Sequence, residues 1–299
     1  MKKWLYTSLI LVTSMVLTFT SCKKEGAEEE DEIAIRELVP TLSYFSVDDA
    51  YLEGGFVSDT LRPGEAKGDT FVIGWWRRPL SISRDIYVNF ASDSAFVQVK
   101  THIYGKFHLV YVSFSGDTVD TFSVEKPLHD VITRYGLFVR EGALDDPHRG
   151  WVLKAVSFGF CESKDVPDTL MRFTIDSLKI GYYNDSIQQV RTYSDFAILI
   201  PIEDLPTIGQ VGQVKFELWT SPAFPGVMAW LYKSRKWGVP VRVRMIPEGG
   251  YFTYTMPVPS DTASGINRFG ISVIPAFSFR PSQEYPYVTR GILFPFISR

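Results

Sequence analysis

The stretch AFVQVKTHIY, residues 95–104, decides the fold of this chain, because apolar and polar side chains alternate along it. Successive side chains of a β-strand point to opposite faces of a sheet, so this alternation is typical of a strand with one buried face. The same period of two begins near Thr70 and continues to about Tyr182. The strands that it predicts are Phe71–Trp76, Arg84–Phe90, Ala95–Tyr104, Lys106–Ser113, Thr118–Val124, Val131–Arg140, Trp151–Cys161 and Thr169–Tyr182.

Compact turn sequences separate these strands at Ser92–Ser94, Ser115–Asp117 and Asp145–His148. Short connections join antiparallel neighbours, because parallel strands need long crossovers. Ahead of the strands, apolar residues recur at helical spacing from Ile33 to Gly55, and Pro40 divides this segment. For residues 33–183 the sequence therefore predicts an α+β domain, in which a helical lead covers one face of a curved antiparallel sheet.

A second series of short strands begins near Asn184. It comprises Asp195–Ile202, Gln213–Trp219, Val227–Tyr232, Val239–Met245, Tyr251–Met256, Asn267–Pro275 and Val288–Phe296. Short strands with regular turn signals resemble an Ig-like β-sandwich, which implies a separate domain over residues 184–299. The fold class is thus mainly β with a helical N-terminal lead. The expected core of the second domain is Phe196, Ile198, Ile200, Val214, Phe216, Leu218, Trp230, Phe269, Ile271 and Val273.

The first twenty-two residues have the parts of a secretory signal peptide: a basic start, an apolar run from Trp4 to Phe19, and small residues before Cys22. An apolar run of about 15 residues rises only about 22 Å as a helix, which is too short to span a bilayer core of roughly 30 Å. The stretch Phe19–Cys22 resembles a lipobox. This resemblance implies that residues 1–21 are removed and that acyl chains on Cys22 bind the protein to a membrane. The alternative is a plain cleaved signal peptide.

Residues 23–32, KKEGAEEEDE, contain six acidic residues and no large apolar one. We expect residues 22–32 to form an unfolded acidic tether, because such a segment buries too little surface to fold; extended, it spans about 35 Å. A basic pair and an acidic run after the lipidated cysteine resemble the export signal of surface-exposed lipoproteins of the Bacteroidota type. The resemblance implies the outer face of an outer membrane. The alternative is a generic solvated linker.

The net charge of the chain limits the classes of partner that it can be expected to bind. The whole chain has 31 basic and 34 acidic residues, and residues 33–299 retain 27 basic and 28 acidic ones. The expected folded part is therefore nearly neutral, which argues against nucleic acid as a partner.

Two segments of the first domain, Tyr135–Glu141 and Arg149–Val156, form a predicted strand, turn and strand with the pattern Gly-Trp-x-Leu. They resemble the last hairpin of NTF2-like domains, in which a cone-shaped sheet encloses a pocket. The resemblance implies a pocket where an acid such as Asp85, with Tyr104 or Tyr135, transfers protons. An unrelated antiparallel sheet is the alternative.

Few residues carry recognisable chemistry. Cys161 lies in an apolar strand, so we expect a buried, inert thiol. No nucleophile elbow, P-loop or dinucleotide-binding motif occurs, and the histidines lack the spacings of metal ligands. The sequence therefore predicts no enzyme, no metal and no cofactor. The histidines, expected at the surface or satisfied in the core, are His102, His108, His129 and His148.

Two local features predict a binding surface. Adjacent strand residues point to opposite faces, so we expect one of Trp75 and Trp76 in the core and the other exposed beside Arg77. The alternative packs both indoles against the helix. The second feature is the acid-free segment from Leu218 to Pro247, which resembles a basic, aromatic surface for an anionic glycan or lipopolysaccharide headgroup; the alternative is a solvated sheet face. Its candidate binding residues are Lys233, Arg235, Lys236, Trp237, Arg242 and Arg244.

These observations predict a noncatalytic binding lipoprotein of the outer membrane, lipid-anchored and exposed at the cell surface. Its partner is a glycan or an envelope protein, and in the second case it has an accessory role in an envelope assembly. The alternative is a small-molecule enzyme or carrier built on an NTF2-like domain. A cavity with converging polar groups would favour this alternative, and an exposed Trp/Arg patch over a filled core would favour the noncatalytic binding protein.

Overall fold

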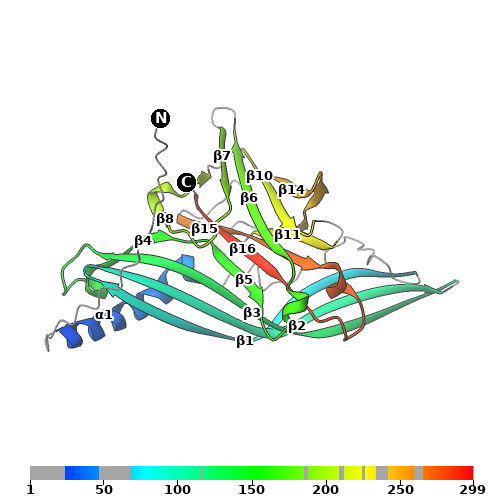
Figure 1. Ribbon diagram of the computed structural model, residues 1–299, viewed down its shortest axis with the longest axis horizontal. Coiled ribbons are helices and arrows are strands. Elements are labelled where there is room, and N and C mark those ends of the chain that lie inside the picture. The colour runs from blue at the N-terminus through cyan, green and yellow to red at the C-terminus, as the bar shows by residue number, and fades with distance from the viewer. Residues whose placement is uncertain are drawn as a thin grey trace, which may run out of the picture.

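The structure is a computed structural model that describes residues 24–46, 69–115, 117–184, 188–208, 212–223, 226–233, 242–258 and 265–298. It is mainly β with an N-terminal helix and a curled antiparallel sheet, which confirms the fold class (Figure 1). Cys22 and the helical and loop predictions for residues 47–68 lie outside the described residues.

The elements are α1 (Lys24–Leu38), η1 (Val39–Thr41), η2 (Ser43–Phe45), β1 (Asp69–Ala91), β2 (Ser94–Ser115), β3 (Thr118–Arg140), η3 (Pro147–Gly150), β4 (Trp151–Val156), β5 (Gly159–Ser163), η4 (Asp168–Leu170), β6 (Thr174–Tyr183), β7 (Gln188–Tyr193), β8 (Ile200–Pro201), η5 (Ile202–Asp204), β9 (Thr207–Ile208), β10 (Gln213–Ser221), β11 (Val227–Lys233), β12 (Arg242–Arg244), β13 (Ile246–Glu248), β14 (Tyr251–Pro257), β15 (Gly265–Pro275), η7 (Ala276–Phe279) and β16 (Arg290–Ser298).

Three long strands, β1, β2 and β3, form an antiparallel meander along the length of the molecule (Figure 1). The predicted turns at Ser92–Ser94 and Ser115–Asp117 join them, but the breaks expected near Pro79 and Gly105 do not end the strands. Pro79 pairs with Gly105 next to a register shift. A Cβ at Gly105 would lie 2.2 Å from the carbonyl oxygen of Arg78. Glycine therefore permits the close approach that carries β1 and β2 through this point.

Both sheets mix strands from the two halves of the chain. The larger sheet has the order β1-β2-β3-β5-β16-β15-β11-β12, and the smaller has the order β13-β14-β10-β6-β7. Strand β5 pairs with β16, and β6 pairs with β10. The domain boundary expected between residues 183 and 184 is therefore wrong as a division of the sheets, because strands on either side of it pair with each other.

The acidic segment is helical. Helix α1 contains the acidic run that we expected to be an unfolded tether, so that expectation is wrong for residues 24–32. Asp31 is only 6 % exposed and accepts hydrogen bonds from Arg140, Arg149 and the indole of Trp151. Acidic side chains also favour the N-terminal part of a helix, because they offset its dipole. Charge therefore helps to dock this helix, together with the buried apolar side chains of Ala34, Ile35 and Leu38.

The helical lead covers one face of β3. The ring of Phe45 stacks on Phe138 at 6.3 Å, and a Cβ at Gly136 would lie 2.9 Å from the Phe45 ring. The hydroxyl of Tyr44 donates to the carbonyl of Ser157 at 2.7 Å. Because side chains alternate along a strand, Tyr135 points to the opposite face, away from the lead.

Most of the core expected in the second half is buried, including Phe216, Trp230 and Ile271. Two members are not. Ile198 is 53 % exposed and Phe196 is half-buried, because residues 194–199 form a loop and not the predicted strand. Cys161 is buried, as expected.

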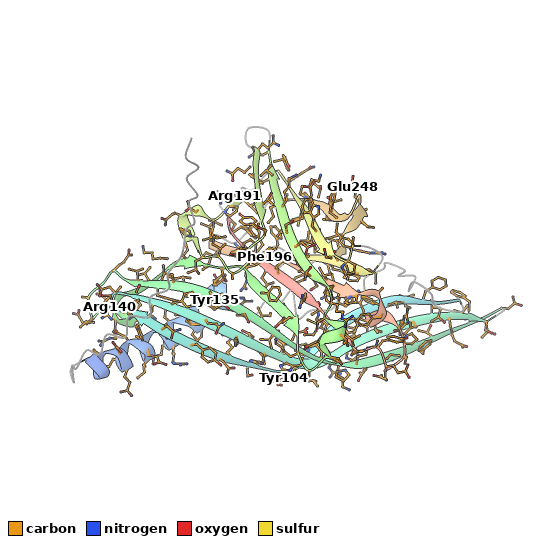
Figure 2. The ribbon with its side chains drawn as sticks, viewed as in Figure 1. Tyr104, Tyr135, Arg140, Arg191, Phe196 and Glu248 are labelled. Atoms are coloured by element: carbon orange, nitrogen blue, oxygen red, sulfur yellow. The ribbon has the colours of Figure 1, made fainter. Side chains whose placement is uncertain are left out.

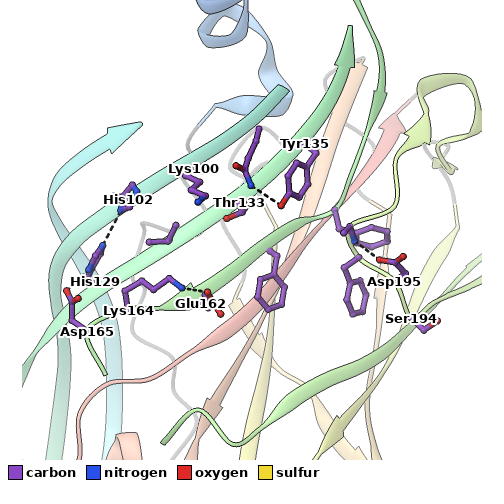
Figure 3. A pocket seen from close by; sticks show the side chains of 16 residues that line it. Lys100, His102, His129, Thr133, Tyr135, Glu162, Lys164, Asp165, Ser194 and Asp195 are labelled. Atoms are coloured by element: carbon purple, nitrogen blue, oxygen red, sulfur yellow. Dashed lines mark hydrogen bonds and ion pairs between the residues drawn. The ribbon is translucent and has the colours of Figure 1, made fainter. Parts of the chain in front are cut away.

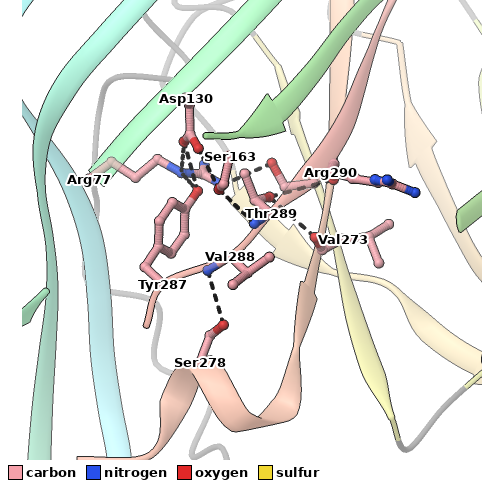
Figure 4. A network of polar contacts seen from close by, with 10 residues as sticks. Arg77, Asp130, Ser163, Val273, Ser278, Tyr287, Val288, Thr289 and Arg290 are labelled. Atoms are coloured by element: carbon pink, nitrogen blue, oxygen red, sulfur yellow. Dashed lines mark hydrogen bonds and ion pairs between the residues drawn. The ribbon is translucent and has the colours of Figure 1, made fainter. Parts of the chain in front are cut away.

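A buried polar network links strands β1, β3 and β5 to the segment that precedes β16 (Figure 4). The Arg77 Nε donates to the Tyr287 hydroxyl at 2.7 Å, and that hydroxyl donates to Asp130 Oδ2 at 3.0 Å. The Ser163 hydroxyl donates to the other carboxylate oxygen of Asp130 at 2.7 Å. Burial raises the pKa of Tyr287 well above its usual value, so the phenol keeps the proton that it donates to Asp130.

Candidate functional site

A cleft of about 800 Å³ lies on the face of β2, β3 and β5 that points away from the helical lead (Figure 3). Its floor comes from alternate residues of these strands, and residues 194–197 close one side. The floor residues are Gln98, Lys100, His102, His129, Val131, Thr133, Tyr135, Phe160 and Glu162, and the walls add Phe158, Lys164, Asp165, Ser194, Asp195, Phe196 and Ala197.

The strand register brings aromatic and hydrogen-bonding side chains together on this floor. Gln98 pairs with Tyr135, and its side-chain amide donates to the Tyr135 hydroxyl at 2.9 Å. The ring of Phe96 stacks on Tyr135 with 5.4 Å between centroids. Tyr135 is therefore held in place from two sides, with part of its surface still accessible.

The wall that faces Tyr135 across the cleft is the tight loop of residues 194–197, which follows β7. Asp195 accepts a hydrogen bond from the backbone N–H of Ala197 at 2.9 Å, which fixes the turn of this loop. Phe196 packs edge-on against the buried Phe158 ring at 5.3 Å. Tyr135 and Phe196 lie on the same side of the long strands (Figure 2). The cleft thus has aromatic rings on both its floor and its wall.

A chain of four titratable side chains occupies the other end of the cleft. Asp85 Oδ2 lies 3.1 Å from His102 Nε2, and His102 Nδ1 lies 3.3 Å from His129 Nε2. His129 Nδ1 in turn lies 2.6 Å from Asp165 Oδ2. The Tyr104 ring stacks on the His129 ring at 4.1 Å. Two imidazoles are therefore each oriented by an aspartate and face each other.

The fixed charges that line the cleft have a small negative excess. Glu162, Asp165 and Asp195 line it, and Asp85 lies beside it, whereas the lining contributes only two lysines. Lys164 forms an ion pair with Glu162, and the Lys100 ammonium lies 5.5 Å from the Tyr87 ring centre. The cleft therefore suits a neutral or cationic ligand better than an anionic one.

The binding feature predicted at Trp75, Trp76 and Arg77 is less exposed in the structure than the sequence suggests. Trp75 is buried against Trp230, with 5.1 Å between ring centroids, and Trp76 is half-buried with its ring stacked on His108. Arg77 is only 2 % exposed, so the expectation of an exposed Arg77 is wrong. Arg77 shares the inward face with Trp75, because residues two apart point the same way, and the Asp130 network holds it there. Trp75 packs against Phe107, Trp230 and Phe279, and Trp76 packs against His108, so neither ring contact involves the N-terminal helix.

The predicted basic surface is described only in part. The Arg242 guanidinium lies 4.2 Å from the centre of the buried Trp75 ring, so this residue packs on the core. Arg244 is half-buried on the same short strand. Arg235, Lys236 and Trp237, and the side chain of Lys233, lie outside the described residues. A basic surface around Arg244 stays a prediction.

The sequence predicts Asp85, Tyr104 and Tyr135 as pocket residues, but it does not predict the pairing of His102 with His129. The available signal was the run of polar residues at positions 98, 100 and 102, which share one strand face. Which residues of the next strand lie opposite them depends on the register, and the sequence does not show it.

No protein-family model matches the chain, and no curated protein matches it either. In the described part of the chain, no helix is long and apolar enough to cross a membrane. Within the described ranges, no three His, Cys, Asp or Glu side chains are placed to hold a metal ion together.

Proposed function

We propose that this protein is a lipid-anchored lipoprotein of the outer membrane, exposed at the cell surface, which binds a glycan in the cleft without altering it. The observation that carries the proposal is the pairing of accessible aromatic rings, Tyr135 and Phe196, with hydrogen-bonding side chains in one cleft. Sugar rings present apolar faces that stack on aromatic side chains and hydroxyls that need polar partners. A volume of about 800 Å³ is in the range of small-ligand sites.

The polar groups of the cleft support the same ligand class. Gln98, Thr133 and Asp195 offer amide, hydroxyl and carboxylate groups within it. These groups can donate to or accept from sugar hydroxyls. The surplus of carboxylates favours a neutral glycan over an acidic one, which differs from the anionic glycan expected for the basic segment. An envelope protein that presents such a glycan would be the partner.

We predict that Tyr135→Ala and Phe196→Ala each weaken glycan binding by about tenfold or more, because loss of a stacking contact of about 1.4 kcal/mol corresponds to that factor. An oligosaccharide array would identify the ligand, and calorimetry with the best glycan would measure the affinities. Phe114→Ala is the matched control, because Phe114 is an exposed aromatic residue near the end of β2 and outside the cleft. A wild-type protein that retains no glycan, or cleft variants with unchanged affinity, would contradict the proposal.

The anchor has its own test. Cys22→Ser should move the protein from the membrane fraction to the soluble fraction, because the thiol that carries the acyl chains is removed. Cys161→Ala should leave the protein in the membrane fraction, since Cys161 is a buried thiol in the strand core. Immunoblots of the two fractions and the mass of the mature N-terminal peptide would measure the outcome. An unmodified Cys22 still joined to Ser21 in the native protein would exclude the anchor.

The Asp85–His102–His129–Asp165 chain favours a second candidate, a pocket enzyme that transfers protons to or from its ligand. Imidazoles oriented by carboxylates are the usual groups for general acid–base catalysis. Analysis of the bound glycan after long incubation separates the two candidates, because only the enzyme would release a cleaved or rearranged product.

A further inference from the structure

The hydrogen bonds of the histidine pair determine where its protons lie. An ionised carboxylate can only accept a hydrogen bond, so His102 Nε2 must carry the proton that faces Asp85. By the same reasoning His129 Nδ1 carries the proton that faces Asp165. A neutral imidazole has one N–H. The two inner atoms, His102 Nδ1 and His129 Nε2, are therefore both bare when the imidazoles are neutral, although they lie only 3.3 Å apart.

Two bare imidazole nitrogens at this separation have the geometry of two ligands on one metal ion. Zinc–nitrogen bonds of about 2.05 Å at a tetrahedral angle place the two nitrogens about 3.3 Å apart. The outer partners also fit, because histidines that bind metal commonly donate their other N–H to a carboxylate. Asp85 and Asp165 supply this contact for His102 and His129 respectively.

Charge complementarity supports a cation here. Three carboxylates and two lysines line the cleft, Asp85 lies beside it, and Lys164 is already paired with Glu162. With neutral imidazoles, a divalent ion would offset this excess of negative charge. The stacked Tyr104 ring covers one face of His129 and limits the ways in which its ring can turn.

We propose that His102 and His129 bind a divalent transition-metal ion, with zinc as the representative, at the end of the cleft. Because the described residues offer no third side-chain ligand of the His, Cys, Asp or Glu type, the protein fills two positions and leaves the others open. Water or hydroxyl oxygens of the bound ligand fill the open positions. This inference deepens the glycan-binding proposal and rests on it only for the oxygen donors, since the two histidines are placed without any ligand.

Zinc titration of the soluble protein, residues 23–299 without an affinity tag, tests the site by calorimetry. We expect saturable binding of one zinc ion per chain. His102→Gln and His129→Gln should each abolish it, whereas Asp85→Asn and Asp165→Asn should weaken it by about 10–100-fold, because the carboxylates only orient the ligands. His148→Asn removes a histidine outside the cleft and should leave zinc affinity unchanged.

Two results would overturn the site: no saturable binding up to about 1 mM zinc, or binding that persists in His102→Gln. Nitrogen NMR of the imidazoles gives a second readout, in which zinc should shift the resonances of His102 Nδ1 and His129 Nε2 selectively. If the two rings instead share one proton and ignore zinc, the site is a hydrogen-bonded pair. Thermal melts of each variant exclude misfolding. Glycan affinity without zinc is measured separately, so a failed metal site and a failed glycan site give different results.

Discussion

Asp130→Ala is expected to lower the free energy of unfolding by about 3–5 kcal/mol, the usual cost of removing one partner of a buried charge pair. Asp130 is fully buried, accepts from Tyr287 and Ser163, and lies 4.0 Å from the Arg77 Nε. The substitution removes the counter-charge of the buried Arg77 guanidinium and the acceptor of two hydroxyl groups. Urea denaturation, monitored by tryptophan fluorescence, measures the change in the free energy of unfolding.

The control for this prediction is Asp120→Ala. Asp120 lies on the same strand, β3, but is exposed, so the same substitution should change stability by less than about 0.5 kcal/mol. If Asp130→Ala and Asp120→Ala cost the same, the network in Figure 4 contributes specificity of packing and not stability.

The local pattern of the sequence predicted the strands well. Alternation at residues 95–104 and the turns at Ser92–Ser94 and Ser115–Asp117 correctly gave antiparallel hairpins. The lengths of the strands were wrong, because Pro79 and Gly105 ordinarily end a strand. Here Pro79 and Gly105 lie opposite each other next to a register shift, so both fall at one irregular point and the two strands continue past it.

The arrangement of the strands was not predictable from local pattern. Strands β5 and β16 pair although more than a hundred residues separate them in the sequence. Pairing of this kind depends on the complementarity of whole sheet edges, and a period of two says nothing about which edges meet. The predicted boundary at residues 183 and 184 failed for this reason.

Charged residues were the other source of error. From the sequence, Arg77 is expected at the surface and Asp31 in a tether, because charges are rarely buried alone. Each is buried with partners that lie far away in sequence: Tyr287 for Arg77, and Arg140 and Arg149 for Asp31. The same holds for the cleft: the sequence suggests Asp85, with Tyr104 or Tyr135, as pocket residues, but the register of the strands determines which side chains lie next to each other.

Asp31→Ala is expected to lower the free energy of unfolding by about 3 kcal/mol, because hydrogen bonds to charged groups contribute about 1.5–3 kcal/mol each and are not additive. The loss should release α1 from the sheet, which hydrogen exchange of the α1 amides would detect. Glu28→Ala is the control: Glu28 is an exposed acidic residue of the same helix and should change stability by less than about 0.5 kcal/mol.

The pH dependence separates an ion pair from simple packing at Asp31. Burial alone would raise the pKa of Asp31, but hydrogen bonds from Arg149, Arg140 and Trp151 outweigh it and hold the pKa below its usual value. The ionised form therefore stabilises the fold at neutral pH, and the advantage of the wild type over Asp31→Ala should shrink as pH falls below about 4. A difference that stays constant would assign the effect to packing.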